Sequence, residues 1–215
     1  MPIMRTLERA RARKDGPLFL EAVSRYNAKM RELKRAGVVR SHITTSMPQI
    51  PERLWTKISD QTYERTVGPQ VERLGKYEAF SDNVYGELLP RFIADVLRRT
   101  RLAPNSVFVD LGSGVGNCVL QAALATGCEA HGFENMPLAA SLAQAQVEEA
   151  RKRAAMWGLD TGEMHVREAD FCNDEEVGKV LRRADVVLVN NEVCAFLLRP
   201  HAHSIDRWCA VSLRR

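Results

Sequence analysis

Apolar and polar positions follow two different rhythms in the second half of the chain. Four short segments predict strands, and the first and last of them are strongly apolar. They span residues 106–110, 129–134, 163–169 and 185–190. Between them, apolar residues spaced three and four apart predict helices over 117–125 and 138–157. This alternation predicts an α/β fold, a Rossmann-like doubly wound parallel sheet with helices on both faces and a ligand at the carboxyl ends of the strands.

The first eighty residues show a different pattern. Residues 17–36 predict a basic helix that ends at a glycine, whereas 38–80 lose clear periodicity and carry several prolines, which predicts loops and short helices. An amphipathic helix is predicted next, over 88–100. We therefore expect a mostly helical N-terminal extension over 1–80 and an α/β domain over 81–215.

A glycine turn follows the first predicted strand. Residues 107–117 read Val-Phe-Val-Asp-Leu-Gly-Ser-Gly-Val-Gly-Asn. Three glycines two apart allow a sharp turn and leave main-chain N–H groups open to a ligand. Dinucleotide-binding turns read G-x-G-x-x-G, but Asn117 stands where that pattern needs its last glycine. The tighter spacing, with Asp110 before it, favours S-adenosylmethionine over a nicotinamide or flavin cofactor, because this acid can lie near the cationic methionine end.

Polar or aromatic residues also follow the other predicted strands. Glu134 ends the second strand, where a carboxylate can accept hydrogen bonds from both ribose hydroxyls. Asp170 and Phe171 follow the third and could bind the adenine amino group and cover the base. Asn190 and Asn191 follow the fourth, placed to meet a substrate nitrogen. Taken singly, Glu134 also fits a solvent-facing strand end, Phe171 a core aromatic, and the two asparagines a turn. Taken together, these residues predict an adenosyl site.

Composition and charge narrow the class of protein. The 215 residues are 45% hydrophobic, enough for one core of ordinary size. The chain has neither an apolar run long enough for a membrane span nor a secretory signal, so we expect a soluble intracellular protein. Residues 1–40 hold eleven basic and four acidic side chains, against a net charge of +4 overall. This basic arm favours a polyanionic partner, although a solvated helix face explains it equally well.

The five cysteines form no C-x-x-C pair, and their odd number fits a reducing compartment better than a disulfide framework. Cys194, His201, His203 and Cys209 could be drawn as a zinc site. Their spacing matches no familiar zinc pattern, and the segment lacks turn residues that would fold it around a metal. We therefore expect no metal.

Taken together, these motifs resemble the disruptor-of-telomeric-silencing family of nucleosomal histone-lysine methyltransferases, particularly its fungal branch. The resemblance covers residues 63–191 and rests on Tyr85-Gly-Glu-Leu88, Asp110 to Asn117 with the following 118–124, Glu134, Trp157-Gly-Leu159, Asp170-Phe171 and Val187-Leu-Val-Asn-Asn191. It implies the class I S-adenosylmethionine-dependent methyltransferase fold rather than the SET fold. It also implies a nuclear enzyme that regulates chromatin by methylating a lysine on the globular core of histone H3 in nucleosomes.

The same resemblance implies roles for particular residues. Residues 85–88 would close over the methionine part of the donor, 108–117 would hold its amino acid and ribose edge, and Asn190 would lie near the transferred methyl group. Basic segments such as 1–40 would contact nucleosomal DNA and histones. No general base is assigned. The implied donor-binding residues are Tyr85, Gly86, Glu87, Leu88, Phe108, Val109, Asp110, Leu111, Gly112, Ser113, Gly114, Val115, Gly116, Asn117, Glu134, Asp170, Phe171 and Asn190.

The chain departs from the family pattern after Asn191. Where the family continues with aromatic residues that wall the lysine channel, residues 192–200 read Glu-Val-Cys-Ala-Phe-Leu-Leu-Arg-Pro, and 210–214 echo only the fifth strand of the family. We therefore expect a domain without the last two strands of the sheet, with weaker donor binding and reduced or absent methyl transfer. Two alternatives stay open: a methyltransferase for RNA, a small molecule or a non-histone protein, and a non-catalytic chromatin-binding module.

Overall fold

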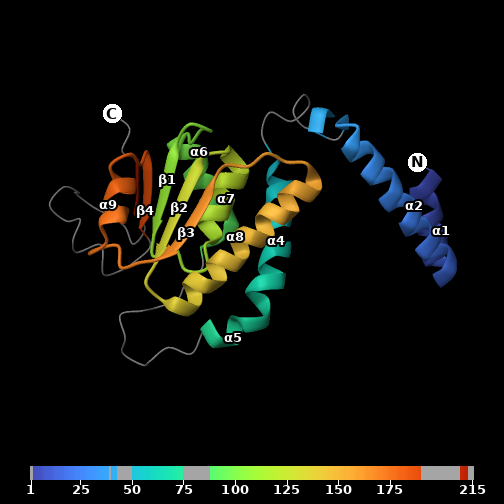
Figure 1. Ribbon diagram of the computed structural model, residues 1–215, viewed down its shortest axis with the longest axis horizontal. Coiled ribbons are helices and arrows are strands. Elements are labelled where there is room, and N and C mark those ends of the chain that lie inside the picture. The colour runs from blue at the N-terminus through green and yellow to red at the C-terminus, as the bar shows by residue number, and fades with distance from the viewer. Residues whose placement is uncertain (1, 39, 43–49, 75–87, 190–208, 213–215) are drawn as a thin grey trace. The chain divides into compact units, whose positions relative to one another are not determined.

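A computed structural model describes residues 2–38, 40–42, 50–74, 88–189 and 209–212 (Figure 1). The chain forms two compact units, Met1–Pro48 and Gln49–Arg215. The boundary expected at residues 80 and 81 differs from this division, because the helix at 52–66 packs against the helices at 117–126 and 137–157 and belongs to the second unit. None of the helices in the described ranges is both long and apolar enough to cross a membrane.

The first unit contains a pair of helices, α1 (Pro2–Ala12) and α2 (Gly16–Arg35). The Asp15 side chain caps α2 by accepting a hydrogen bond from the backbone N–H of Leu18 at 3.0 Å. Ala10 of α1 and Ala22 of α2 are buried, since small side chains let the two helices approach closely. The structure confirms the helix predicted at 17–36, whereas α1 was not predicted from the sequence.

The second unit is built on a five-stranded sheet of order β3-β2-β1-β4-β5 (Figure 1). Four strands are parallel: β1 (Val107–Leu111), β2 (Glu129–Glu134), β3 (Met164–Glu168) and β4 (Val186–Val189). They confirm the four predicted strands. The fifth, β5 (Cys209–Ser212), runs antiparallel to β4, so the sheet is parallel only in part. An antiparallel edge strand is common on such sheets, because it needs no crossover helix.

Helices cover both faces of the sheet. One face carries α6 (Pro90–Thr100), α7 (Asn117–Thr126) and α8 (Pro137–Trp157), and the other carries α9 (Glu175–Leu181), as Figure 1 shows. On the α9 face, alternate residues of β1 and β4 form an apolar cluster with Val177. The doubly wound arrangement predicted from the alternation of strands and helices is therefore confirmed.

A longer helix than expected occupies part of the 38–80 segment. The helix α4 (Glu52–Thr66) buries Trp55, Ile58 and Thr62 and packs against α8 and α7. It is followed by the short helices η1 (Gly68–Gln70) and α5 (Val71–Leu74). The prediction of only loops and short helices was wrong here, because packing against α8 stabilises a helix whose own apolar stripe is narrow.

Candidate functional site

The glycine turn joins β1 to α7 at the carboxyl end of the parallel strands. Gly112, Gly114 and Gly116 have φ angles of +78°, +54° and +85°, a region that L side chains rarely adopt. The backbone N–H groups of Gly112 and Ser113 both donate to the carbonyl of Phe133, at 2.9 and 3.0 Å. The G-x-G-x-G spacing is thus the spacing that this backbone requires, and β2 holds the turn in place.

Glu134 lies directly beside the turn. Its Oε2 accepts a hydrogen bond from the backbone N–H of Gly114 at 2.8 Å, and its Oε1 accepts from that of Met136 at 2.9 Å. The side chain is buried. Each carboxylate oxygen has a second lone pair, so Glu134 can accept further hydrogen bonds from a ligand's hydroxyl groups while it keeps both backbone contacts.

Asp110 is the second acid at this end of the sheet, and it is only 3% exposed. Burial raises its pKa from 3.8 to about 7; a side-chain hydrogen bond with Cys118 opposes this rise, and the negative charge of Glu134 adds to it. A cationic group placed beside Asp110 would favour its charged form. The site therefore has the electrostatics to receive a positively charged ligand group.

Gln146 of α8 fixes the turn from its other side, a contact that the sequence did not reveal. Its Nε2 donates to the carbonyl of Val115 at 2.7 Å and to Oδ1 of Asn117 at 2.9 Å. The side chain is wholly buried. A lone glutamine among the alanines of a buried helix face was the signal that could have pointed to this role, because a buried amide needs hydrogen-bond partners.

Gly132 of β2 makes room for the turn. A Cβ atom built at this position would lie 2.7 Å from Oγ of Ser113 and 2.8 Å from a methyl carbon of Val119. Only glycine lets the turn and α7 approach the strand this closely. A glycine inside a predicted strand is itself a sign of close backbone approach, and Gly132 was the signal that could have revealed this contact.

Asp170 and Phe171 follow β3 at the same end of the sheet. The backbone N–H of Ala169 donates to the carbonyl of Glu134 at 2.9 Å, which places this segment next to the end of β2. Asp170 is exposed and accepts hydrogen bonds from the backbone of Cys172 and the side chain of Asn173. Phe171 packs against the apolar cluster under α9 but is only partly buried, so part of this residue stays exposed.

The structure brings most of the predicted donor-binding residues together, from Phe108 to Asn117 with Glu134 and the segment at Asp170. Leu88 is half-buried just before α6. Tyr85, Gly86, Glu87 and Asn190 lie outside the described residues. So do Asn191, Cys194, His201, His203 and the side chain of Cys209, and the zinc alternative is untested.

Known proteins similar to this chain include fungal enzymes called "Histone-lysine N-methyltransferase, H3 lysine-79 specific". Those from Mycosarcoma maydis and Chaetomium globosum are 50% identical over 192 residues and 46% identical over 203. The matches cover 88% and 94% of this chain, but only 24% and 40% of the two relatives. The chain thus spans between a quarter and two fifths of the length of these relatives.

A family model supports the same assignment. The model described as "Histone methylation protein DOT1" matches residues 63–202, which include the glycine turn, Glu134 and Asp170. The doubly wound sheet with this turn at its carboxyl edge is the class I methyltransferase fold that the sequence predicted. From its sequence and its fold, the chain belongs to the DOT1 family of histone methylation proteins.

Proposed function

We propose that this chain is the methyltransferase region of a histone-lysine N-methyltransferase, which transfers a methyl group from S-adenosylmethionine to lysine 79 of nucleosomal histone H3. The observation that carries the proposal is the convergence of Gly114, Glu134 and Asp110 at the carboxyl edge of the sheet, in a chain that resembles H3 lysine-79-specific enzymes. The donor class follows from the turn, and the acceptor class follows from the relatives.

In this proposal, each part of the site binds one part of the donor. The backbone of residues 112–116 lies along the methionine and ribose, and Glu134 accepts from the ribose hydroxyls. Asp110 faces the cationic methionine end, and Asp170 with Phe171 binds the adenine. Residues 85–88 close over the methionine part, and Asn190 lies near the methyl group. Two facts support this arrangement: Glu134 contacts the turn, and Asp110 is a buried acid whose pKa is raised by burial and by the charge of Glu134.

For methyl transfer, the protein mainly has to align the lysine amine with the methyl group of the donor. S-Adenosylmethionine, when bound, supplies a methyl group that is already electrophilic. The protein must hold a neutral lysine amine in line with the bond that breaks and must exclude water. A free lysine has a pKa of about 10.4, so a weakly polar channel that disfavours the ammonium form would help it to lose its proton. No general base is assigned among the described residues.

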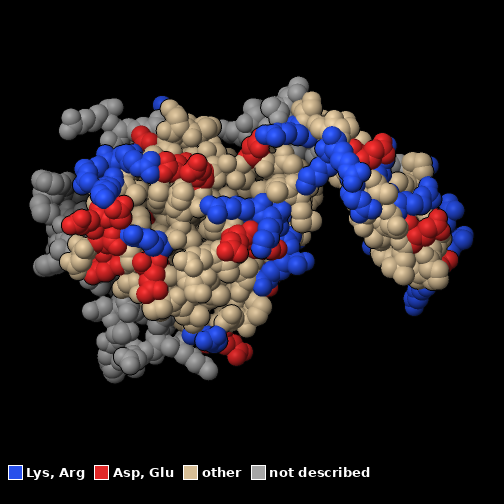
Figure 2. All heavy atoms as spheres, in the orientation of Figure 1, with Lys and Arg blue, Asp and Glu red and all other residues tan. Residues whose placement is uncertain are grey.

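The basic first unit is proposed to bind nucleosomal DNA in the nucleus. Residues 1–40 carry eleven basic side chains, and Figure 2 shows lysines and arginines spread along this unit. Contacts to phosphates release counterions, so binding should weaken steeply as salt rises. The double substitution Arg25→Glu with Lys29→Glu should reduce both nucleosome affinity and its salt dependence. Lys152→Glu with Arg65→Glu, a matched charge reversal on the second unit, tests whether the effect is local.

Donor binding and methyl transfer are tested separately. Calorimetric titration with S-adenosylmethionine should show binding to the parent chain and none to Gly114→Arg, whose side chain would fill the turn. Circular dichroism checks that this variant is folded. Methylation assays with nucleosomes, free histones and RNA as acceptors then identify the substrate. Donor binding with methylation of RNA alone would overturn the histone assignment, and nucleosome binding without donor binding would favour a non-catalytic chromatin module.

A further inference from the structure

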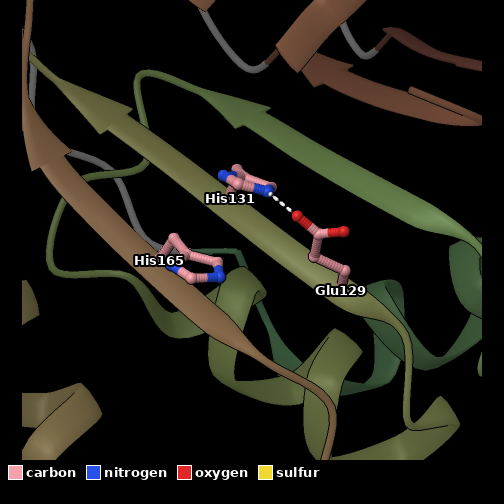
Figure 3. A group of neighbouring side chains, drawn as sticks. All are labelled: Glu129, His131 and His165. Atoms are coloured by element: carbon pink, nitrogen blue, oxygen red, sulfur yellow. Dashed lines mark hydrogen bonds and ion pairs between the residues drawn. The ribbon is translucent and has the colours of Figure 1, made fainter. Parts of the chain in front are cut away.

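A second group of ligating side chains lies on the α9 face of the sheet, away from the glycine turn. Glu129 and His131 are two residues apart on β2, so both point to the same face. His165 of β3 is the direct register partner of His131. Figure 3 shows the three side chains gathered over these two strands, and each offers one ligand atom within 4.8 Å of the others.

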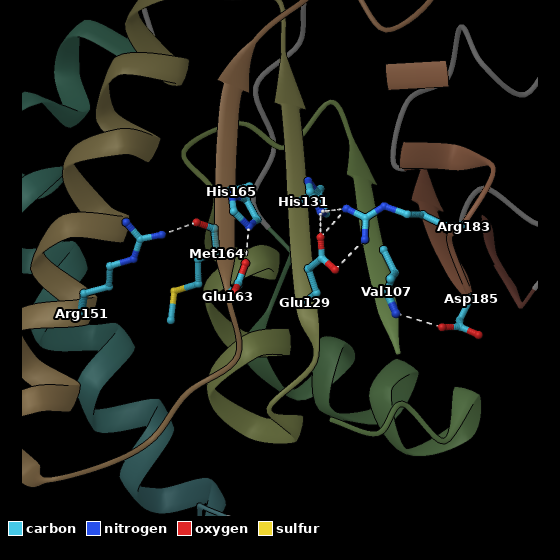
Figure 4. Close-up of polar contacts among 9 residues, drawn as sticks. All are labelled: Val107, Glu129, His131, Arg151, Glu163, Met164, His165, Arg183 and Asp185. Carbon is cyan, nitrogen blue, oxygen red and sulfur yellow. Dashed lines mark hydrogen bonds and ion pairs between the residues drawn. The ribbon is translucent and has the colours of Figure 1, made fainter. Parts of the chain in front are cut away.

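The contacts within this group are close. Nε2 of His131 lies 2.6 Å from Oε1 of Glu129, and the rings of His131 and His165 stack with centroids 4.7 Å apart. Arg183, which follows α9, donates hydrogen bonds to both carboxylate oxygens of Glu129 (Figure 4). One of its guanidinium nitrogens also lies 3.3 Å from Nε2 of His131. That nitrogen can donate to Glu129 or accept from Arg183, but not both, because it carries either a proton or a lone pair.

The Glu129 carboxylate therefore attracts a cation to the position of the Arg183 guanidinium. The guanidinium cannot pair with both Glu129 oxygens and Nε2 of His131 while that nitrogen donates to Glu129. Arg183 can leave, since half of its side chain is exposed and it sits in a surface turn. Access from solvent is open as well: His131 and His165 line a hollow of about 500 Å³ together with Phe133, Arg167 and Val180. An ion and its water ligands can reach the imidazole nitrogens through this hollow.

From this arrangement we propose that Glu129, His131 and His165 bind a divalent transition metal of the zinc type, with Arg183 displaced and water completing the coordination. Two imidazoles and one carboxylate suit zinc and its neighbours, whereas magnesium and calcium prefer oxygen ligands alone. Ligands about 2.1 Å from a tetrahedral ion lie roughly 3.4 Å apart. The paired strands hold His131 and His165 opposite each other, so in this proposal changes in side-chain torsions shorten the present spacing of up to 4.8 Å to that distance.

The metal would join β2 to β3, which is the edge strand at this end of the sheet. It would not touch the methyl donor, since His131 and Glu134 are three residues apart on one strand, about 10 Å at 3.3 Å per residue. The proposal is thus independent of the proposed methyl transfer. Zinc binding at this group would raise the stability of the sheet edge whether or not the donor is present.

Calorimetric titration of the whole chain with zinc chloride near neutral pH tests the site. The parent should bind one zinc ion in the micromolar range, and His131→Ala or His165→Ala should weaken this binding at least about tenfold. Arg183→Ala should tighten it, because a competing cation is gone. His42→Ala, which removes a histidine of the first unit, should leave it unchanged. Titration with S-adenosylmethionine or circular dichroism confirms that each variant is folded.

Two results would overturn the proposal: a parent chain that binds no zinc below millimolar concentration, or zinc affinity that both histidine substitutions leave unchanged. Weaker binding in Arg183→Ala would overturn the assignment of Arg183 as the displaced group. The absorption spectrum of the chain with cobalt in place of zinc distinguishes binding at this group from binding at a cysteine. A spectrum without a thiolate-to-metal charge-transfer band supports the Glu129 group, and a band lost in Cys172→Ser would move the site to sulfur.

Discussion

The buried acid beside the glycine turn should make the protein less stable as the pH rises. Burial raises the pKa of Asp110 to about 7 in the folded chain, from the ordinary 3.8. The folded pKa is the higher of the two, so between about pH 4 and pH 7 the native state binds more protons than the unfolded chain. Stability is therefore lost as the pH rises through this window, and the loss is complete above it.

The magnitude follows from the two pKa values. At 1.36 kcal/mol per unit, the raised pKa of Asp110 lowers the free energy of unfolding by about 2 kcal/mol at pH 5 and by about 4 kcal/mol at pH 8. Asp110→Asn removes the titration. The free energy of unfolding of this variant, relative to that of the parent, should increase by about 2 to 3 kcal/mol between the two pH values. Effects of the substitution that do not depend on pH cancel in this comparison.

Urea unfolding at both pH values measures the effect, with the intrinsic fluorescence of the three tryptophans as the probe. Asp60→Asn is the matched control, because it removes an exposed carboxyl from α4 and should leave the pH dependence of the parent unchanged. A stability difference between Asp110→Asn and the parent that is the same at pH 5 and pH 8 would refute the reasoning. Such a result would mean that Asp110 is hydrated in solution, whereas the structure shows it buried.

Three further predictions concern the supports of the site. Gln146→Leu leaves the buried carbonyl of Val115 unpaired, so the free energy of unfolding measured in urea should fall by about 1 to 3 kcal/mol. The affinity for S-adenosylmethionine measured by calorimetry should fall as well. Gly132→Ala pushes against Ser113 and should cost about 1 to 3 kcal/mol by the same assay; an unchanged midpoint would contradict the close packing. A hydrogen bond from the Arg167 side chain holds the pKa of Asp174 below its ordinary value of 3.8. The charged carboxylate therefore stabilises the folded chain above pH 3.8, and this contribution is lost as the pH falls further. Thermal unfolding of Asp174→Ala should therefore show a lower midpoint than the parent at neutral pH, with Asn at this position restoring part of it as a helix cap.

The sequence located the glycine turn and the acids around it, because parallel strands bring their carboxyl ends to one edge of the sheet. The bounds of β2 were predicted to the residue, and β1 and β4 to within one. Of these strands, β1 and β4 are buried along their whole length, and such a strand needs mostly apolar residues whichever neighbours it has. The spacing of the three glycines likewise required a particular backbone, which the structure shows.

Only the tertiary structure decided the rest. The helix α4 is stabilised by its contact with α8, and Gln146 reaches a turn about thirty residues earlier in the chain. The raised pKa of Asp110 and the gathering of Glu129 with two histidines also depend on neighbours distant in sequence. Local spacing along the chain specifies backbone conformation, but burial, charge environment and ligand geometry arise only when remote segments pack together.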